Sequence, residues 1–321
     1  MRIADIITAS VASGRKRFSF ELLPPLKGDG KDSIFRAIDK VVDLDPAFID
    51  ITCHRLMDKK RELPDGTVEY YSAHRRPGTV GISAAIKSRY DIEVVPHMIC
   101  GGMSRYDIED ALIDLDFLGL NNVMALRGDK ARGEDRFTPH PQGHAGALDL
   151  VKQIVAMNKG QFVDGEVEEC HHSKFGIGVA GYPEKHFEAD SLDSDIAHLK
   201  EKVDAGAQYV LTQLFFDNSK FYEFHDKCRA AGITVPIVPG LKPLSILKHL
   251  TILPETFSIS IPEELRDEVL AHADDKDAIR KIGSDWCIRQ CKDLQAHGFP
   301  FIHFYSSSRT EELRRIIEEA F

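Results

Sequence analysis

Residues 18–25 read Phe-Ser-Phe-Glu-Leu-Leu-Pro-Pro, a strand-like run that ends at two prolines. Proline lacks a backbone N–H and fixes φ, so a strand cannot continue beyond Pro24. Glu21 therefore stands where a strand ends, in apolar surroundings that raise the pKa of a carboxyl group because desolvation disfavours its charged form. Such a carboxyl group can serve as a general acid near neutral pH. The alternative is a Glu21 that points into solvent.

Eight runs along the chain resemble strands, and most are short, apolar and rich in Val, Ile and Phe, which is typical of strands buried on both faces. They are predicted at Arg17–Glu21, Phe48–Cys53, Glu93–Ile99, Asn122–Leu126, Phe175–Ala180, Tyr209–Gln213, Val235–Pro239 and Pro300–Tyr305. Helices are predicted between them at Asp32–Leu44, Gly78–Tyr90, Asp107–Leu118, Leu148–Asn158, Asp193–Ala205, Ser219–Ala231 and Lys276–His297. Ser104 is available to cap the third helix.

Strands that alternate with helices predict a parallel sheet. Eight alternations over 321 residues favour a closed (β/α)8 barrel of the TIM type, formed as a single domain by residues 1–321. The competing fold is an open doubly wound sheet, which usually carries a Gly-rich nucleotide loop after its first strand. Two prolines follow the first strand here, so we predict the barrel.

The composition is that of a soluble globular protein, with 43% hydrophobic and 29% charged residues and a formal net charge of −10. This charge argues against a broad basic surface for nucleic acid, although a local basic pocket for an anionic ligand is compatible with it. No apolar stretch has the length of a membrane span, and the N-terminus shows no signal-peptide pattern. The six cysteines are scattered, as expected for free thiols in a reducing compartment. We expect a cytoplasmic protein without nucleic-acid or membrane partners.

The polar stretch 158–174 is predicted to be a loop insertion. It contains Cys170-His171-His172, a combination of residues that can ligate metal. Three adjacent residues cannot all point at one ion from a regular element, and no spaced partner is evident. We therefore expect no metal site.

In a (β/α)8 barrel the active site forms at the carboxyl ends of the strands. Polar or aromatic residues stand at the predicted strand ends or close to them, at Glu21, Thr52, His97, Arg127, Asp129, Tyr182, His186 and Gln213. Each of these residues could also have a purely structural role. His97 could be a core histidine whose hydrogen bonds are made within the protein, and Arg127 could pair with Asp129. Their convergence on one mouth favours a site. Arg127, His186 and Lys202 could bind phosphates, and Tyr182 offers an aromatic face, so the set fits a phosphate-bearing cofactor with a planar ring.

Seven motifs along the chain complete this pattern. They are Phe20-Glu21-Leu22-Leu23-Pro24-Pro25, Pro96-His97, Ala125-Leu126-Arg127-Gly128-Asp129, Tyr182-Pro183-Glu184-Lys185-His186, Lys202-Val203-Asp204-Ala205-Gly206-Ala207, Thr212-Gln213-Leu214-Phe215-Phe216-Asp217 and Pro239-Gly240. In this order the set resembles the methylenetetrahydrofolate reductases, flavoproteins that make 5-methyltetrahydrofolate for methionine synthesis.

The resemblance implies a barrel that binds FAD, with NADH or NADPH and the folate substrate visiting the flavin in turn. The family's acid falls on Glu21, and a carboxylate close to flavin and folate falls on Asp129. The family's FAD contacts fall on Thr52, His97, Arg127, Gly128, Asp129, Ala180, Tyr182, His186, Asp195 and Lys202. Its folate-binding glutamine falls on Gln213, beside substrate contacts at Glu21 and Asp129.

Three departures from the family pattern stand out. Where some members place an aromatic residue that stacks on folate or nicotinamide, spacing offers Leu253, with His249 one turn earlier. An aromatic FAD contact is missing or shifted, with His144 and Gly146 nearby. The sequence ends at Phe321, so we expect neither the regulatory domain of the animal enzymes nor its inhibition by S-adenosylmethionine.

Implied by the resemblance are two half-reactions, in which the flavin takes a hydride from NAD(P)H and passes it to methylenetetrahydrofolate. A protonated Glu21 would open the one-carbon bridge, and an ionised Asp129 would stabilise the cation that forms. The rival interpretation is a non-redox (β/α)8 aldolase or phosphosugar lyase, and a non-enzymatic binding module is a third. The choice between NADH and NADPH stays open, as does a homo-oligomeric state.

Overall fold

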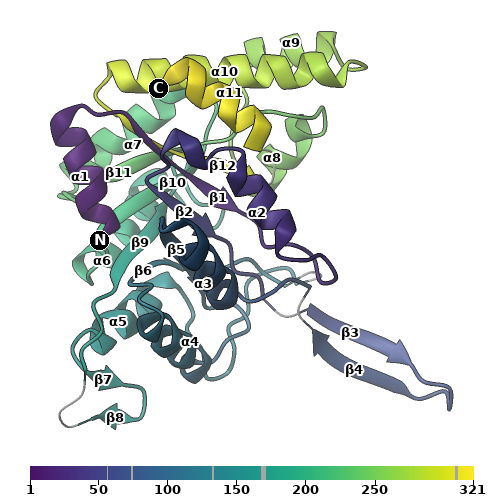
Figure 1. Cartoon of the computed structure of the whole chain (residues 1–321), viewed down its shortest axis with the longest axis vertical. Coiled ribbons are helices and arrows are strands. Elements are labelled where there is room, and N and C mark those ends of the chain that lie inside the picture. The colour runs from purple at the N-terminus through teal and green to yellow at the C-terminus, as the bar shows by residue number, and fades with distance from the viewer. Residues whose placement is uncertain (56, 74, 132–133, 168–170, 308–309) are drawn as a thin grey trace.

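The computed structural model describes residues 1–55, 57–73, 75–131, 134–167, 171–307 and 310–321. Within these residues, eight parallel strands close into a barrel, as Figure 1 shows. Around the barrel they run β1 (Arg17–Leu22), β12 (Phe301–Ser307), β11 (Ile237–Leu241), β10 (Tyr209–Leu214), β9 (Gly176–Gly181), β6 (Asn122–Leu126), β5 (Glu93–Ile99) and β2 (Phe48–Ile51). Each predicted strand overlaps one of them, which confirms the (β/α)8 fold.

Helices surround this barrel. They are α1 (Ile3–Ser13), α2 (Asp32–Asp39), α3 (Thr79–Tyr90), α4 (Arg105–Phe117), α5 (Ala147–Met157), α6 (Leu192–Asp204), α7 (Asn218–Ala230), α8 (His249–Phe257), α9 (Glu263–Ala271), α10 (Lys276–Ala296) and α11 (Thr310–Ala320). Ser104 caps α4 in a reciprocal capping box with Asp107, as its position predicted.

The predicted helix at Asp32–Leu44 is too long. Helix α2 ends at Asp39, and a short 3₁₀ turn, η1 (Val42–Leu44), follows. The break falls at Val41, whose φ of −136° lies outside the helical region. Val41 and Val42 are β-branched and lose side-chain freedom in a helix, which favours this early end. The sequence analysis also missed α1, α8, α9 and α11.

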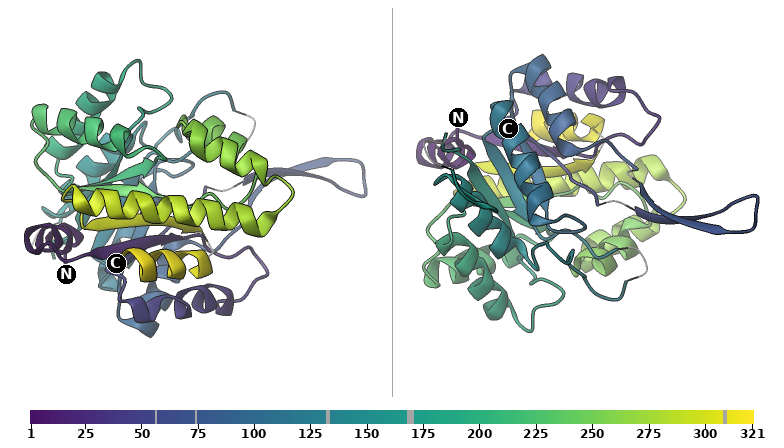
Figure 2. Two further views of the ribbon diagram at one scale, coloured as in Figure 1. Left: turned by 90° about the horizontal axis from the view of Figure 1, so that it is seen from above. Right: turned by 90° about the horizontal axis from the view of Figure 1, so that it is seen from below.

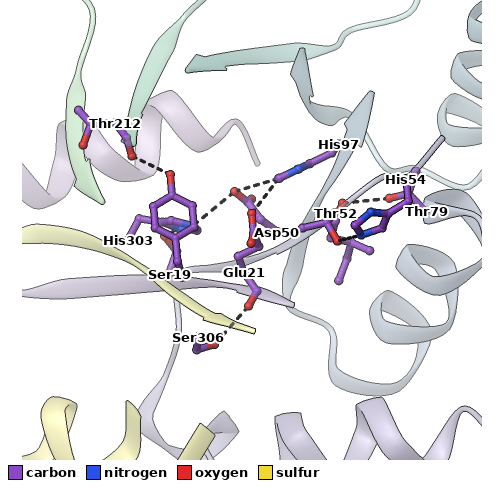
Figure 3. Close-up of polar contacts among 12 residues, drawn as sticks. Ser19, Glu21, Asp50, Thr52, His54, Thr79, His97, Thr212, His303 and Ser306 are labelled. Carbon is purple, nitrogen blue, oxygen red and sulfur yellow. Dashed lines mark hydrogen bonds and ion pairs between the residues drawn. The ribbon is translucent and has the colours of Figure 1, made fainter. Parts of the chain in front are cut away.

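Helix α1 covers one end of the barrel. Ile3 and Ile7 are buried in one apolar cluster with Phe48 of β2 and Phe301 of β12, whose rings stack with their centroids 5.8 Å apart. These side chains fill the barrel interior near the strands' amino ends. The polar groups gather farther along the strands, towards the carboxyl ends (Figure 3). The packed core therefore leaves the carboxyl end for a site.

Two hairpins lie outside the barrel. Strands β3 (Met57–Glu62) and β4 (Val68–Ala73) pair antiparallel and project from the body, at the end opposite α1 (Figure 2). The second hairpin, β7 (Gln161–Phe162) with β8 (Gly165–Glu166), lies in the stretch predicted as a loop. Cys170 of the candidate metal run lies outside the described residues, so that prediction stays untested. No helix in the described part of the chain combines the length and apolarity that a membrane crossing needs.

The glycine spacing of a nucleotide loop, G-x-G-x-x-G, occurs once, at residues 176–181, but these residues do not form such a loop. These residues form β9 itself, in the middle of the sheet. A Cβ at Gly178 would collide with the ring of Tyr209 on β10, and one at Gly181 would meet Val210 at 2.8 Å. The glycines therefore make room for side chains of the neighbouring strand inside the barrel wall.

Candidate active site

Glu21 lies inside the barrel at the carboxyl end of β1. Successive strand residues point to opposite faces, so Phe18 and Phe20 face outwards while Ser19 and Glu21 face the interior. The Glu21 side chain is 18% exposed. Burial raises the pKa of Glu21, and Asp50 raises it further, while His97 and Lys242 oppose the shift. The raised pKa agrees with the prediction, but its source is enclosure in the barrel and a second carboxylate, because the apolar neighbours in sequence face the other way.

Asp50 is a buried residue of the candidate site that the sequence analysis missed. It lies in β2 beside Glu21 in the register of the two strands, and its side chain is 1% exposed. His97 Nε2 approaches its Oδ2 at 3.6 Å, and His303 Nε2 approaches the same atom at 3.9 Å (Figure 3). Both carboxylate oxygens lack a hydrogen-bond partner among the described residues. The available signal was an acidic residue in the middle of an apolar strand.

The two histidines beside Asp50 have pKa values that are shifted in opposite directions. Burial lowers the pKa of His97, but the contacts with Asp50 and Glu21 outweigh burial, and the pKa rises overall. His303 has its pKa lowered to about 4, chiefly by burial, so it is neutral at pH 7. Its Nδ1 lies 2.8 Å from the Ser19 hydroxyl. If that hydroxyl donates, the ring proton sits on Nε2 and faces Asp50.

A second group of predicted residues meets between β9 and α6. Lys202 donates from Nζ to the carbonyl oxygen of Ala180 at 3.1 Å, and burial lowers the pKa of Lys202 to about 8. The backbone N–H of His186 donates to Asp195 at 2.8 Å. The rings of Tyr182 and His186 meet edge to face, with centroids 4.8 Å apart. This group combines a buried amine, a carboxylate and two rings.

Arg127 makes a different contact from the one weighed in the sequence analysis. Its guanidinium pairs with Glu188 and lies over the Phe137 ring at 4.8 Å. Among the described residues no ion pair joins Arg127 to Asp129. Gly128 has φ of 83°, a conformation that brings the backbone round with little steric cost only for glycine. Asp129 is exposed immediately after this turn.

Two predicted residues lie on other strand ends. Thr52 Oγ1 is 3.0 Å from His54 Nε2 just beyond β2. Gln213 of β10 accepts a hydrogen bond at Oε1 from the N–H of Leu214, at 2.9 Å.

The candidate replacements for the family's aromatic contacts are engaged within the protein. Leu253 is buried in a cluster with Leu214 and Phe216, at 4% exposure, so it presents no stacking surface. His249 Nδ1 accepts from the N–H of Ser245 at 3.2 Å. His144 contacts Gln153, and Gly146 caps α5. The structure therefore leaves Leu253 without an exposed stacking surface and gives His249 and His144 hydrogen-bond partners within the protein.

Comparison with known proteins agrees with this arrangement. A family model described as methylenetetrahydrofolate reductase matches residues 6–320. Methylenetetrahydrofolate reductase (NADH) 1 of Arabidopsis thaliana is 35% identical over 315 residues, covering 95% of this chain, which spans about half of that protein's length, 48%. The 5,10-methylenetetrahydrofolate reductase of Escherichia coli K12 is 29% identical, over 96% of this chain and 92% of its own.

Among solved structures, an uncharacterised protein from Clostridium thermocellum that binds two copies of 5-methyl-5,6,7,8-tetrahydrofolic acid covers 98% of this chain and 97% of its own. Its TM-score is 0.55 at 14% identity, which supports the shared fold. The near-complete family match, together with the motifs at the barrel mouth, shows that this chain belongs to the methylenetetrahydrofolate reductase family.

Proposed function

We propose that the chain reduces 5,10-methylenetetrahydrofolate to 5-methyltetrahydrofolate with NADH or NADPH, through bound FAD and in two half-reactions, feeding methionine synthesis. The observation that carries the proposal is Glu21, a carboxyl group with a raised pKa at the carboxyl end of a barrel whose other end is closed. Family membership supplies the reaction class.

The residues between β9, α6 and β6 suit FAD. Lys202 is a buried amine with a pKa of about 8 and a carbonyl oxygen as its hydrogen-bond partner, so a phosphate would supply a counter-charge. Arg127 offers a second cation. The residues that would hold the cofactor are Thr52, His97, Arg127, Gly128, Asp129, Ala180, Tyr182, His186, Asp195 and Lys202. When bound, a flavin supplies hydride transfer between nicotinamide and folate.

The chain's own residues supply proton transfer and charge. Glu21, as the neutral acid, would protonate a ring nitrogen of the folate, which lets the one-carbon bridge open to a cation. Asp129 would stabilise that cation as a carboxylate, and Gln213 would hydrogen-bond the folate. These roles need Glu21 protonated near neutral pH, which burial in the barrel favours.

The test is a visible spectrum of the purified protein, followed by chromatography of the cofactor released by heat. We expect a flavin spectrum, release of FAD, bleaching by NADH or NADPH and recovery of the colour on adding methylenetetrahydrofolate. A colourless protein that does not bind added FAD would favour the rival aldolase or lyase. Release of FMN would refute the FAD assignment.

A further inference from the structure

A continuous array of polar side chains crosses the barrel interior behind Glu21. His97 Nε2 is 3.9 Å from Glu21 Oε2 and 3.6 Å from Asp50 Oδ2. His303 reaches the same Asp50 oxygen from the other side. The array thus links β1, β5, β2 and β12, and Figure 3 shows Asp50 between the two histidines.

Charge balance within this array is uneven. It contains two carboxyl groups, Glu21 and Asp50, and His303 is neutral, so His97 is the member of the array that can carry a positive charge between them. Keeping two carboxylates ionised beside one cation in a buried space costs electrostatic free energy, so protonation of one of them is favoured. Asp50 is nearer to His97 and is faced by a second imidazole, whereas Glu21 lies at the open end.

We propose that Asp50 is a positioning residue for the folate half-reaction: it anchors the His97 imidazolium, and its own buried carboxylate beside Glu21 opposes a second negative charge there, which keeps Glu21 protonated over the working pH range. This inference rests on the proposed function for its catalytic consequence, but the geometry of the array stands independently. Asp50 touches neither folate nor flavin in this scheme and acts through His97 and Glu21.

The remaining groups that face the array do not replace this effect. Tyr209 of β10 and Tyr305 of β12 have pKa values raised well above the ordinary value, chiefly by burial, so both are neutral. Lys242, just beyond β11, donates to the Tyr305 carbonyl oxygen at 2.9 Å. Its charge lowers the pKa of Glu21, but this is the smallest of the four contributions, after Asp50.

Asp50→Asn tests the proposal because it removes the charge and keeps the shape. Asp50 raises the pKa of both Glu21 and His97, so the His97 value should fall in the variant. Because a charged His97 lowers the pKa of Glu21, the effect on Glu21 is measured in a His97→Gln background, where this opposing charge is absent. A charge at this distance typically shifts a pKa by about one unit or more. In flavin-loaded His97→Gln protein, adding Asp50→Asn should move the high-pH limb of the folate half-reaction to lower pH by about that amount, or about tenfold in rate at a fixed pH on the limb. Flavin reduction by the nicotinamide should keep its pH profile.

NMR of protein labelled with ¹³C in its histidine rings gives a readout that does not need turnover. The His97 signal, assigned with His97→Gln, should titrate about one unit or more lower in Asp50→Asn than in the wild type. Asp43→Asn is the matched control, because Asp43 pairs with Arg314 at the surface. It should leave both the His97 titration and the folate profile unchanged.

Several outcomes would overturn the proposal. One is a wild-type His97 that is already neutral at pH 7. This measurement needs no variant, so it can be made even if Asp50→Asn does not fold. Another is an unchanged His97 titration in Asp50→Asn, and a third is a folate profile that Asp50→Asn leaves unchanged in the His97→Gln background. A wild-type protein that reduces no folate would refute the proposed function instead, and the His97 titration alone would then confirm or overturn the array.

Discussion

Lys202→Met should abolish a proton uptake that accompanies FAD binding. Burial lowers the pKa of Lys202 to about 8, and Asp195 offsets only part of that shift. A phosphate beside the amine would restore the charged form, because it supplies a counter-charge in a dry site. Above about pH 8, FAD binding should therefore take up a proton at Lys202.

The size of the uptake follows from this pKa. The free amine is uncharged in about a tenth of the molecules at pH 7, about half at pH 8 and about nine tenths at pH 9. Proton uptake on binding should rise accordingly, from about 0.1 to about 0.9 per FAD between pH 7 and 9. Over the same range FAD affinity should weaken, by up to about tenfold per pH unit above 8.

Calorimetric titration of FAD into flavin-free protein, in buffers of different ionisation enthalpy, measures this uptake directly. Lys202→Met should bind FAD more weakly and show no uptake that rises with pH. Lys200→Met is the matched control, since Lys200 is on the same helix but pairs with Asp204 at the surface. An uptake in the wild type that stays flat from pH 7 to 9, or an equal rise in Lys202→Met, would refute the assignment of Lys202 to a phosphate.

Three further predictions concern the mouth and the barrel wall. Glu21→Gln should slow folate reduction by about 10²–10⁴-fold and leave flavin reduction by the nicotinamide intact. Equal losses of rate in both half-reactions, measured by stopped flow, would indicate that Glu21 has a structural role and is not the acid. Asp129→Asn should raise the flavin reduction potential and slow folate reduction, because a negative charge beside the flavin opposes its anionic reduced form; potentiometry and kinetics that are both unchanged would remove Asp129 from the mechanism. Gly178→Ala should lower the free energy of unfolding by about 1–3 kcal/mol, because its Cβ meets the Tyr209 ring. Denaturant titration checks this against Gly81→Ala on α3, where space is open and the change should be neutral or slightly stabilising.

The barrel could be predicted from the sequence because each strand carries its own signal. Short apolar runs marked all eight strands, and Pro24 marked the end of the first. Helix α11 was within reach too, since Leu313, Ile316, Ile317 and Ala320 form one buried face at helical spacing. Strands β3 and β4 gave a weaker signal: β3 carries charged residues at five adjacent positions, Asp58 to Glu62, in place of apolar alternation. Only the Asp65-Gly66 turn indicated that hairpin.

For the site, the sequence identified the residues more readily than it identified their partners. Those that stand at strand ends, such as Glu21 and Gln213, could be named from the sequence, but their partners depend on contacts between distant segments. Arg127 illustrates the difference. Its ion-pair partner Glu188 is 61 residues further along the sequence, whereas Asp129 is only two residues further. Local spacing favours the near partner, whereas the fold provides the distant one.

Asp50 and His303 show what strand alternation alone could have revealed. In β2 the buried Phe48 faces the barrel interior, so Asp50 two residues later must face it as well. In β12 the same step leads from Phe301 to His303, and in β5 from Val95 to His97. Each of these three strands therefore places an ionisable group in the interior two residues beyond an apolar one, and the three groups meet at Asp50 Oδ2. An apolar layer closes the barrel beneath these ionisable residues, so they face the mouth, where Glu21 Oε2 lies 3.9 Å from His97 Nε2.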